Sequence, residues 1–277
     1  MAVNKFIKSG QKPLFLKLKN IAQKFVKVIF VMYIIDMENL GRLEKDFCFD
    51  SGDFLNGGVL PYSVLKIFQD IAIAHAEALG VGFEAMVSKA MLWVTMRIKY
   101  QVLAQPKPMQ KLKIVTYPSG KNMLEFDRDF LIFDQQNNLL IKGTSKWCLI
   151  NKNTRRLAKM DAIDMVILPN NKPVFEEKFL KTDSFIPDVL ADKSYQIEPN
   201  DIDNNGHTNN TIYAKLAQSL LCENGKKIEF FQINFLKECL LGDRLDIYKK
   251  SLADGKYIVG KICEGPISFS AKAVFEK

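Results

Sequence analysis

The sequence predicts an α+β fold built from two similar halves, each a long helix wrapped by a curved antiparallel sheet. Three observations support this prediction. The same order of elements occurs twice: a strand, a polar loop, one helix and then four strands. Clusters of Pro, Gly, Asn and Asp separate the strand-like runs, which are therefore joined by turns. Matching positions also carry similar residues, because Ile98-Lys99-Tyr100 and Ile233-Asn234-Phe235 both fall in the first long strand after a helix.

The first half is predicted over residues 37–152. Its helix spans 61–79, because Pro61 suits a first turn, Gly80 suits a C-terminal stop, and apolar residues recur at helical spacing between them. A polar loop over 50–58 precedes this helix. Apolar and alternating runs predict strands at 43–49, 92–103, 111–117, 124–133 and 139–150.

The second half is predicted over residues 193–277, after a linker over 153–192 that lacks clear periodicity and contains three prolines. Its predicted elements are a short strand at 194–198, a helix at 209–223, and strands at 226–236, 244–251, 257–263 and 267–275. Two such helix-and-sheet halves in one chain form a tandem, or double, hot-dog fold.

Positive charge is concentrated at the start of the chain. Residues 1–36 hold seven lysines and a single acid, Asp36, and so carry most of the net charge of +8. The apolar run 28–35 is too short to span a bilayer, and no small-residue cleavage site follows it. A basic interfacial helix, a flexible tail and translated sequence upstream of a true start at Met37 are the open alternatives. We favour the last two, so the segment 1–36 is expected to lie outside the fold and away from membranes.

Cysteine and histidine usage excludes several classes of site. The chain has five cysteines, an odd number without a CxxC pair, and only two histidines. This composition argues against a disulfide framework and a metal site, and it favours a reducing, cytoplasmic compartment. Neither a glycine-rich phosphate loop nor a basic-aromatic surface occurs, so the sequence predicts no cofactor and no nucleic-acid partner.

The stretch 201–213 gathers an acid, an amide and an imidazole where the second helix begins. A neutral imidazole such as His207 can take a proton from water near neutral pH. Free backbone N–H groups at a helix start can stabilise an oxyanion. Asn209 and Asn210 are expected to support the loop and cap the helix. The sequence therefore predicts hydrolytic chemistry at this position.

At these residues the sequence resembles the acyl-acyl carrier protein thioesterase family. Residues 203–213 resemble the family's D-x-N-x-H-x-N-N-x-x-Y block, and Glu238-Cys239 resembles its downstream Glu-Cys pair. The first half carries a similar Trp93-Val94 pair, an Arg-Asp-Phe strand at 128–130, a Ser-x-Trp at 145–147 and a Thr-Arg-Arg at 154–156. The resemblance covers about residues 41–277.

The resemblance implies hydrolysis of a fatty acyl thioester on the phosphopantetheine arm of acyl carrier protein, which terminates fatty acid synthesis. Positions with catalytic roles in the family correspond to Asp203, Asn205, His207 and Glu238. Cys239 matches a cysteine once proposed as a nucleophile. The implied setting is the bacterial cytoplasm rather than a plastid, and a homodimer is left open. An acyl-CoA thioesterase of the hot-dog class and a non-catalytic acyl-binding protein are the alternatives.

Glu238 and Cys239 are competing candidates, because adjacent strand residues point to opposite faces. We favour Glu238 as the acid/base residue. The matching first-half positions are Leu103 and Ala104, so the sequence predicts one active site per chain, built mainly by the second half.

The first half is expected to hold the acyl chain. The candidate pocket residues on its helix are Val64, Leu65, Phe68 and Ile71, whereas His75 is expected in the core or the pocket wall. An acidic carrier protein would be attracted by basic side chains, with Lys146, Arg155, Arg156 and Lys215 as candidates.

Overall fold

The computed structural model describes residues 41–163, 171–181, 190–203, 206–221 and 225–276. The chain divides into two units, Met1–Gly41 and Arg42–Lys277, and every element below belongs to the second. The predicted extension 1–36 and the predicted start at Met37 lie outside the described residues. Across the described ranges, no helix has the length and apolar character needed to cross a membrane.

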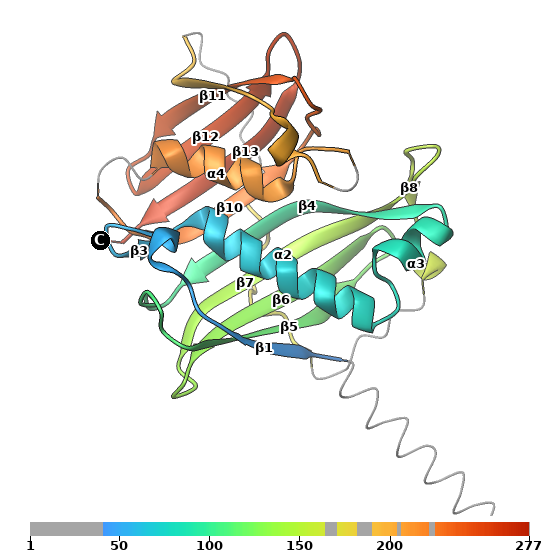
Figure 1. Cartoon of the computed structure of the whole chain (residues 1–277), viewed down its shortest axis with the longest axis horizontal. Helices are drawn as coiled ribbons and strands as arrows, with labels where there is room; N and C mark the ends of the chain where they lie inside the picture. Colours follow the sequence, from blue (N-terminus) through green and yellow to red (C-terminus); the bar gives the residue numbers. More distant parts are fainter. Residues whose placement is uncertain (1–40, 164–170, 182–189, 204–205, 222–224, 277) are drawn as a thin grey trace, which may run out of the picture. The chain divides into compact units, whose positions relative to one another are not determined.

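Helix α2 (Pro61–Ala78) is the central element of the first half, as the apolar periodicity predicts. Pro61 occupies its first turn, Leu79 caps its end, and Gly80 follows with a positive φ of 69° that a glycine adopts without strain. The helix lies against the sheet (Figure 1), and its buried residues pack in the core between the two. The ring of Phe68 stacks on that of Phe130, with ring centroids 4.3 Å apart.

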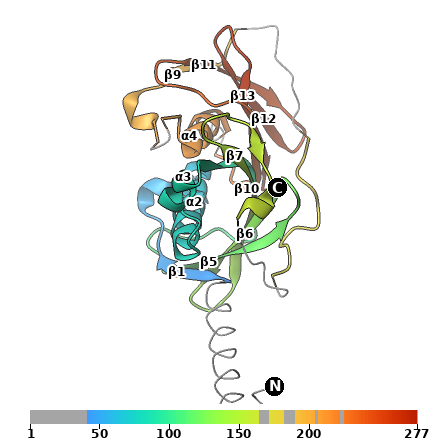
Figure 2. The ribbon, with the colours of Figure 1, turned by 90° about the vertical axis from the view of Figure 1, so that its right-hand side faces the viewer.

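The sheet of the first half is antiparallel throughout, in the order β1-β5-β6-β7-β4. Its strands are β1 (Leu43–Phe47), β4 (Met91–Val102), β5 (Leu112–Lys121), β6 (Glu125–Asp134) and β7 (Leu139–Asn151). Figure 2 shows this sheet curving around α2. Short additions are β2 (Phe54–Leu55), β3 (Gly58–Val59), helix α3 (Phe83–Ser88) and β8 (Leu157–Ala158), which pairs with β7. The sequence patterns predicted neither α3 nor β8.

The second half repeats this plan with a smaller sheet in the order β10-β13-β12-β11-β9. Its elements are β9 (Lys193–Gln196), α4 (Asn210–Leu221), β10 (Ile228–Phe235), β11 (Arg244–Ser251), β12 (Gly255–Ile262) and β13 (Ile267–Phe275). Helix α4 buries Tyr213, Leu216 and Leu220 on the sheet side. The helix and strands of this half agree with the prediction to within a few residues at each end.

Antiparallel pairing of β4 with β10 joins the two halves into one continuous sheet. The register places Ile98 directly opposite Ile233, the two residues whose surroundings match in the sequence. The predicted tandem hot-dog arrangement of two helices on curved antiparallel sheets is therefore present (Figure 1).

The described part of the linker crosses the sheet face opposite α2. Val174 donates its backbone N–H to Asp129 Oδ2 at 2.8 Å, and Asn171 donates its side-chain N–H to the carbonyl of Pro118 at 3.0 Å. The Lys99 ammonium donates to the Glu177 carbonyl at 2.6 Å and lies 4.3 Å from the centre of the Phe175 ring. This segment therefore covers polar and charged groups on the outer face of the sheet.

Candidate active site

A tight loop brings Asp203 and His207 to one wall of a cavity. The backbone N–H of Asp203 donates to the carbonyl of His207 at 2.8 Å, and Asp203 Oδ1 accepts the backbone N–H of His207 at 3.3 Å. Gly206 closes the loop with a φ of 79°, a conformation that favours glycine. Asn205, a predicted catalytic residue, lies outside the described residues, and its role stays a prediction.

The start of α4 adjoins this loop. Asn209 Oδ1 accepts the backbone N–H of Thr211 at 3.0 Å and its hydroxyl at 2.9 Å, which is the geometry of a helix N-cap. The backbone N–H of Asn210, the first helical residue, has no hydrogen-bond acceptor among the described residues. Because Asn209 and Asn210 line the cavity, this helix start can offer a donor to a bound carbonyl oxygen.

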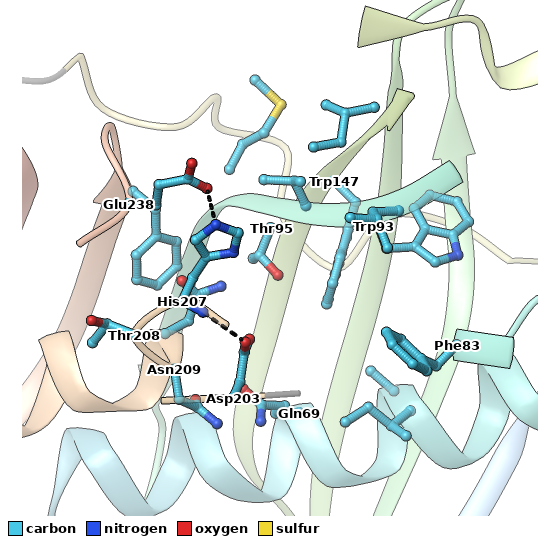
Figure 3. Close-up of a pocket in the computed structure, with 18 of the residues that line it drawn as sticks. Gln69, Phe83, Trp93, Thr95, Trp147, Asp203, His207, Thr208, Asn209 and Glu238 are labelled. Atoms are coloured by element: carbon cyan, nitrogen blue, oxygen red, sulfur yellow. Dashed lines mark hydrogen bonds and ion pairs between the residues drawn. The ribbon is translucent and has the colours of Figure 1, made fainter. Parts of the chain in front are cut away.

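Glu238 and Cys239 lie in the loop after β10 and point to different places. Glu238 lines the cavity, and its Oε2 lies 3.4 Å from His207 Nε2 (Figure 3). Cys239 is fully buried, with Sγ 3.1 Å from Ser268 Oγ, and its burial raises the pKa of the thiol. A thiol that stays protonated and is turned away from the cavity is a poor nucleophile.

Hydrogen bonds with Tyr213 of α4 and with Thr208 hold the backbone of the loop that carries Glu238. Tyr213 Oη accepts the backbone N–H of Cys239 at 3.0 Å, and the carbonyl of Cys239 accepts both the backbone N–H and the hydroxyl of Thr208. Tyr213 is 2% exposed, and burial raises the pKa of its hydroxyl. These bonds fix the backbone of the Glu238 loop relative to the His207 loop.

Arg155 from the first half reaches the same carboxylate. Its Nη2 donates to Glu238 Oε1 at 2.6 Å and also contacts Oε2. The sequence indicated Arg155 only as a residue that could attract a carrier protein. The two residues are 83 positions apart, so local patterns could not have revealed the contact.

The cavity has a volume of about 930 Å³ and extends from these residues along α2 and α3. Figure 3 shows Glu238, His207 and Asp203 on one side and Trp93 and Phe83 on the other. Its apolar lining includes Ala72, Ile73, Ala76, Phe83, Met86, Leu92, Trp93, Phe126, Trp147 and Ile150. Pockets for drug-sized ligands fall in the same range of volume, about 300–1,000 Å³.

The four predicted pocket residues do not line this cavity, but Leu65 and Phe68 line a small second cavity that shares Gln69 and Trp147 with it. That these residues hold the acyl chain stays a prediction. Val64, Leu65, Phe68 and Ile71 are at most 1% exposed and pack in the hydrophobic core between α2 and the sheet. Helical periodicity identifies the buried stripe of α2, but it cannot distinguish core from cavity wall. The cavity instead meets the C-terminal part of the helix from Gln69 onward.

A buried arginine forms part of the cavity wall. Arg128 is 4% exposed, and its guanidinium Nη1 bonds to His75 Nδ1 at 2.8 Å and to Thr116 Oγ1 at 3.3 Å. Burial lowers the pKa of the Arg128 guanidinium to about 10. Because a guanidinium only donates, His75 Nδ1 is the acceptor. His75 is thus a buried side chain that positions Arg128.

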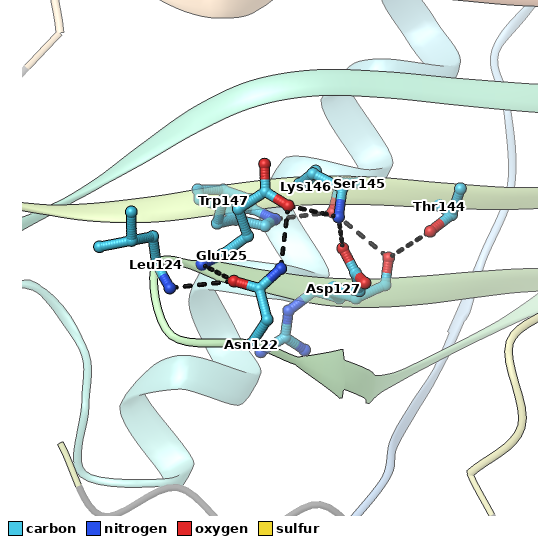
Figure 4. A network of polar contacts seen from close by, with 9 residues as sticks. Asn122, Leu124, Glu125, Asp127, Thr144, Ser145, Lys146 and Trp147 are labelled. Carbon is cyan, nitrogen blue, oxygen red and sulfur yellow. Dashed lines mark hydrogen bonds and ion pairs between the residues drawn. The ribbon is translucent and has the colours of Figure 1, made fainter. Parts of the chain in front are cut away.

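Two of the four basic residues predicted to attract a carrier protein have other partners. Lys146 Nζ lies 3.0 Å from Glu125 Oε2 and 2.8 Å from Asp127 Oδ1, within a polar network on the sheet (Figure 4). Arg155 is paired with Glu238. Arg156 and Lys215 are exposed. The described residues contain no group of three or more potential metal ligands.

Comparison with protein families gives two matches. The model of the acyl-ACP thioesterase N-terminal domain matches residues 27–165, and that of the acyl-ACP thioesterase C-terminal domain matches residues 187–265. The first match begins inside the predicted extension. Together they cover both halves of the fold.

Curated relatives carry related names. The chain is 30% identical over 166 residues to the chloroplastic acyl-[acyl-carrier-protein] hydrolase FATB3 of Cuphea viscosissima, over 54% of this chain and 40% of that protein. It is 24% identical over 237 residues to the chloroplastic oleoyl-acyl carrier protein thioesterase of Coriandrum sativum, over 78% and 63%. The chain thus spans less than two thirds of the length of these relatives.

Solved structures share the fold. An acyl-ACP thioesterase from Bacteroides thetaiotaomicron superposes with a TM-score of 0.76 at 21% identity, covering 86% of this chain and 99% of the other. The 12:0-ACP thioesterase from Umbellularia californica gives 0.68 at 22% identity, covering 85% and 97%. These likenesses extend over both halves of the hot-dog arrangement.

Proposed function

We propose that this chain, which belongs to the acyl-ACP thioesterase family, hydrolyses the thioester between a fatty acyl chain and acyl carrier protein. One observation carries the proposal: His207 and Glu238 face each other, with 3.4 Å between Nε2 and Oε2, at a cavity with a largely apolar lining. The names of the relatives, acyl-[acyl-carrier-protein] hydrolase and oleoyl-acyl carrier protein thioesterase, support this choice of substrate.

In the proposed reaction, His207 acts as the general base. Its Nε2 faces the Glu238 carboxylate, so Nε2 keeps its proton and Nδ1 is the nitrogen that can accept one. A water molecule gives a proton to Nδ1 as its oxygen attacks the carbonyl carbon of the thioester. The C–S bond then breaks, the imidazolium returns the proton to the departing thiolate, and the products are a fatty acid and the carrier thiol.

Charge that develops on the carbonyl oxygen needs a stabilising donor. The backbone N–H of Asn210 at the positive end of α4 is the proposed donor, and the predicted amide of Asn205 is proposed to hold the water or the carbonyl. Asp203 is proposed to keep His207 in place through the two hydrogen bonds that close the loop. The acyl chain would occupy the apolar part of the cavity beside Trp93 and Phe83.

The proposed setting is a reducing compartment such as the bacterial cytoplasm. Four cysteines within the described residues, 48, 148, 239 and 263, are free thiols, which supports this setting. The relatives that carry the same family name are chloroplastic proteins.

The decisive experiment measures steady-state hydrolysis of acyl carrier protein thioesters, from short to long acyl chains, by wild type and His207→Ala. We expect the variant to lose at least ~100-fold in kcat, because general base catalysis contributes about 10²–10⁴-fold. Equal turnover by both proteins would refute the mechanism. The same acyl chain on CoA tests the acyl-CoA alternative, and acyl binding without turnover by wild type would indicate a non-catalytic binding protein.

A further inference from the structure

We propose that Arg155 is a positioning residue that holds the Glu238 carboxylate against His207, so that the first half of the chain completes the active site in the second. This inference rests on the proposed thioester hydrolysis. It adds to that proposal a residue that the sequence indicated only as a candidate for carrier attraction. The contact links a turn after β7 to the loop after β10, and these belong to different halves of the fold.

The direction of the Glu238 carboxylate is set by its side-chain contacts. Strand β10 ends at Phe235, so the pleat of a strand does not set the direction of the Glu238 side chain. The hydrogen bonds that hold this loop are made by the backbone of its other residues, including Lys237 and Cys239 on either side of Glu238. Within the described residues, the carboxylate contacts only Arg155 and His207. Arg155 is therefore the fixed group that can orient it toward the imidazole.

A hydrogen-bonded turn after β7 presents Arg155. Asn151 Oδ1 accepts the backbone N–H groups of Asn153 and Thr154, and the Asn151 carbonyl accepts the N–H of Arg155 at 2.8 Å. Arg155 itself has a φ of 56°, a left-handed conformation that is uncommon for a residue with a side chain. Such conformations persist where the surrounding structure imposes them, and they cluster at functional sites. The turn thus holds Arg155 in a defined place.

The proposed role of Arg155 differs from that of an ordinary surface ion pair. The side chains of Arg155 and Glu238 are 42% and 36% exposed, and ion pairs this exposed contribute little to stability. The loss of Arg155 should therefore leave the fold intact. The geometry of a catalytic group is more sensitive, because a displacement of about 1 Å can cost ~100-fold in rate. Stability and turnover should respond differently to the same substitution.

The test compares Arg155→Ala and Arg155→Lys with Lys152→Ala, which removes a positive charge from the same turn without touching Glu238. With one acyl carrier protein thioester, we expect Arg155→Ala to lower kcat by about 10–100-fold with KM within threefold. Arg155→Lys should lose less, because it keeps the charge but not the two-pronged contact. Lys152→Ala should match wild type. Guanidinium ion added at millimolar concentration should partly restore Arg155→Ala and leave wild type unchanged.

Two further measurements make the test independent of the absolute rate. Arg155→Ala combined with Glu238→Gln should be no slower than Glu238→Gln alone, because both changes remove one interaction. Since the chain has only two histidines, its imidazole NMR spectrum resolves His207 from His75. Arg155→Ala should shift the His207 ring signals and leave those of His75 in place, and Lys152→Ala should shift neither.

Several results would overturn the inference. A raised KM with unchanged kcat would make Arg155 a substrate-binding residue. Unchanged kinetics with unchanged His207 signals would make the contact incidental. Additive losses in the double variant would show that Arg155 acts apart from Glu238. If wild type hydrolyses no thioester, the proposed function fails, and the NMR measurement alone then decides whether Arg155 positions Glu238.

Discussion

Replacing Asp129 by Asn should change how the stability of the protein depends on pH. Asp129 lies on β6, is 1% exposed, and accepts the backbone N–H of Val174 in the linker. Burial raises the pKa of its carboxyl to about 6, although hydrogen bonds to the charged form partly oppose this shift. An Asn in its place keeps an oxygen acceptor for Val174 and has no charge to bury.

The direction and size of this change in stability follow from the raised pKa of Asp129. Because the folded protein binds this proton more tightly than the unfolded chain, the stabilising contribution is complete below the ordinary value of 3.8 and is lost as pH rises through about 6. A shift of about two units corresponds to about 3 kcal/mol. The stability of Asp129→Asn relative to wild type should therefore rise by about 3 kcal/mol between pH 4 and pH 7.5, or roughly 6–12 °C in Tm.

The assay is urea unfolding of both proteins at several pH values, since the difference cancels every other titrating group. Asp134→Asn is the matched control on the same strand. Hydrogen bonds from Asn138 lower the pKa of the exposed Asp134 carboxyl, so their stabilising contribution is fully present above the ordinary value of 3.8. The difference in stability between Asp134→Asn and wild type should therefore stay nearly constant from about pH 5 to pH 7.5. A difference between Asp129→Asn and wild type that stays constant from pH 4 to pH 7.5 would refute the reasoning.

Three more outcomes are expected. Cys239→Ala should keep kcat within threefold of wild type and lower the free energy of unfolding in urea by about 1 kcal/mol, because a small buried group is removed. A 100-fold loss of kcat would instead require a nucleophilic thiolate. Tyr213→Phe leaves the Cys239 N–H without its acceptor, so it should cost about 1–3 kcal/mol and lower kcat, both measurable on one preparation. Ala76→Phe places bulk in the cavity, so turnover of long acyl thioesters should fall before that of short ones in a chain-length panel.

Much of the fold could be predicted because its signals are local. Helix α2 combines a full apolar stripe with Pro61 at its start and Gly80 beyond its end. Helix α3 was missed because six residues are too few to show a helical period. Pairing of β4 with β10 is a contact between strands far apart in the sequence, and the pattern of side chains could suggest only that the two strands are equivalent.

The site was predictable only in part for a similar reason. Asp203 and His207 are four residues apart, so one motif contains both, whereas Glu238 was connected to them through the family resemblance. The contact of Arg155 with Glu238 forms only when both halves of the chain are folded, so no local motif could predict it. The role of the candidate pocket residues stays a prediction, because a buried helix stripe looks the same in sequence whether it meets core or cavity.

The joining of the two halves through β4 and β10 has a consequence for how the protein can vary. In a symmetric dimer of identical subunits, any substitution appears twice and must suit both copies. In this chain the two copies of the fold are encoded separately, so equivalent positions need not hold the same residue. Leu103 and Glu238 are such a pair, because they lie equally far beyond the paired Ile98 and Ile233. A mutation that reshapes the cavity beside α2 leaves the residues around His207 unaltered. Each half can therefore change without an identical change in the other, except where the two meet, as at Arg155 and Glu238.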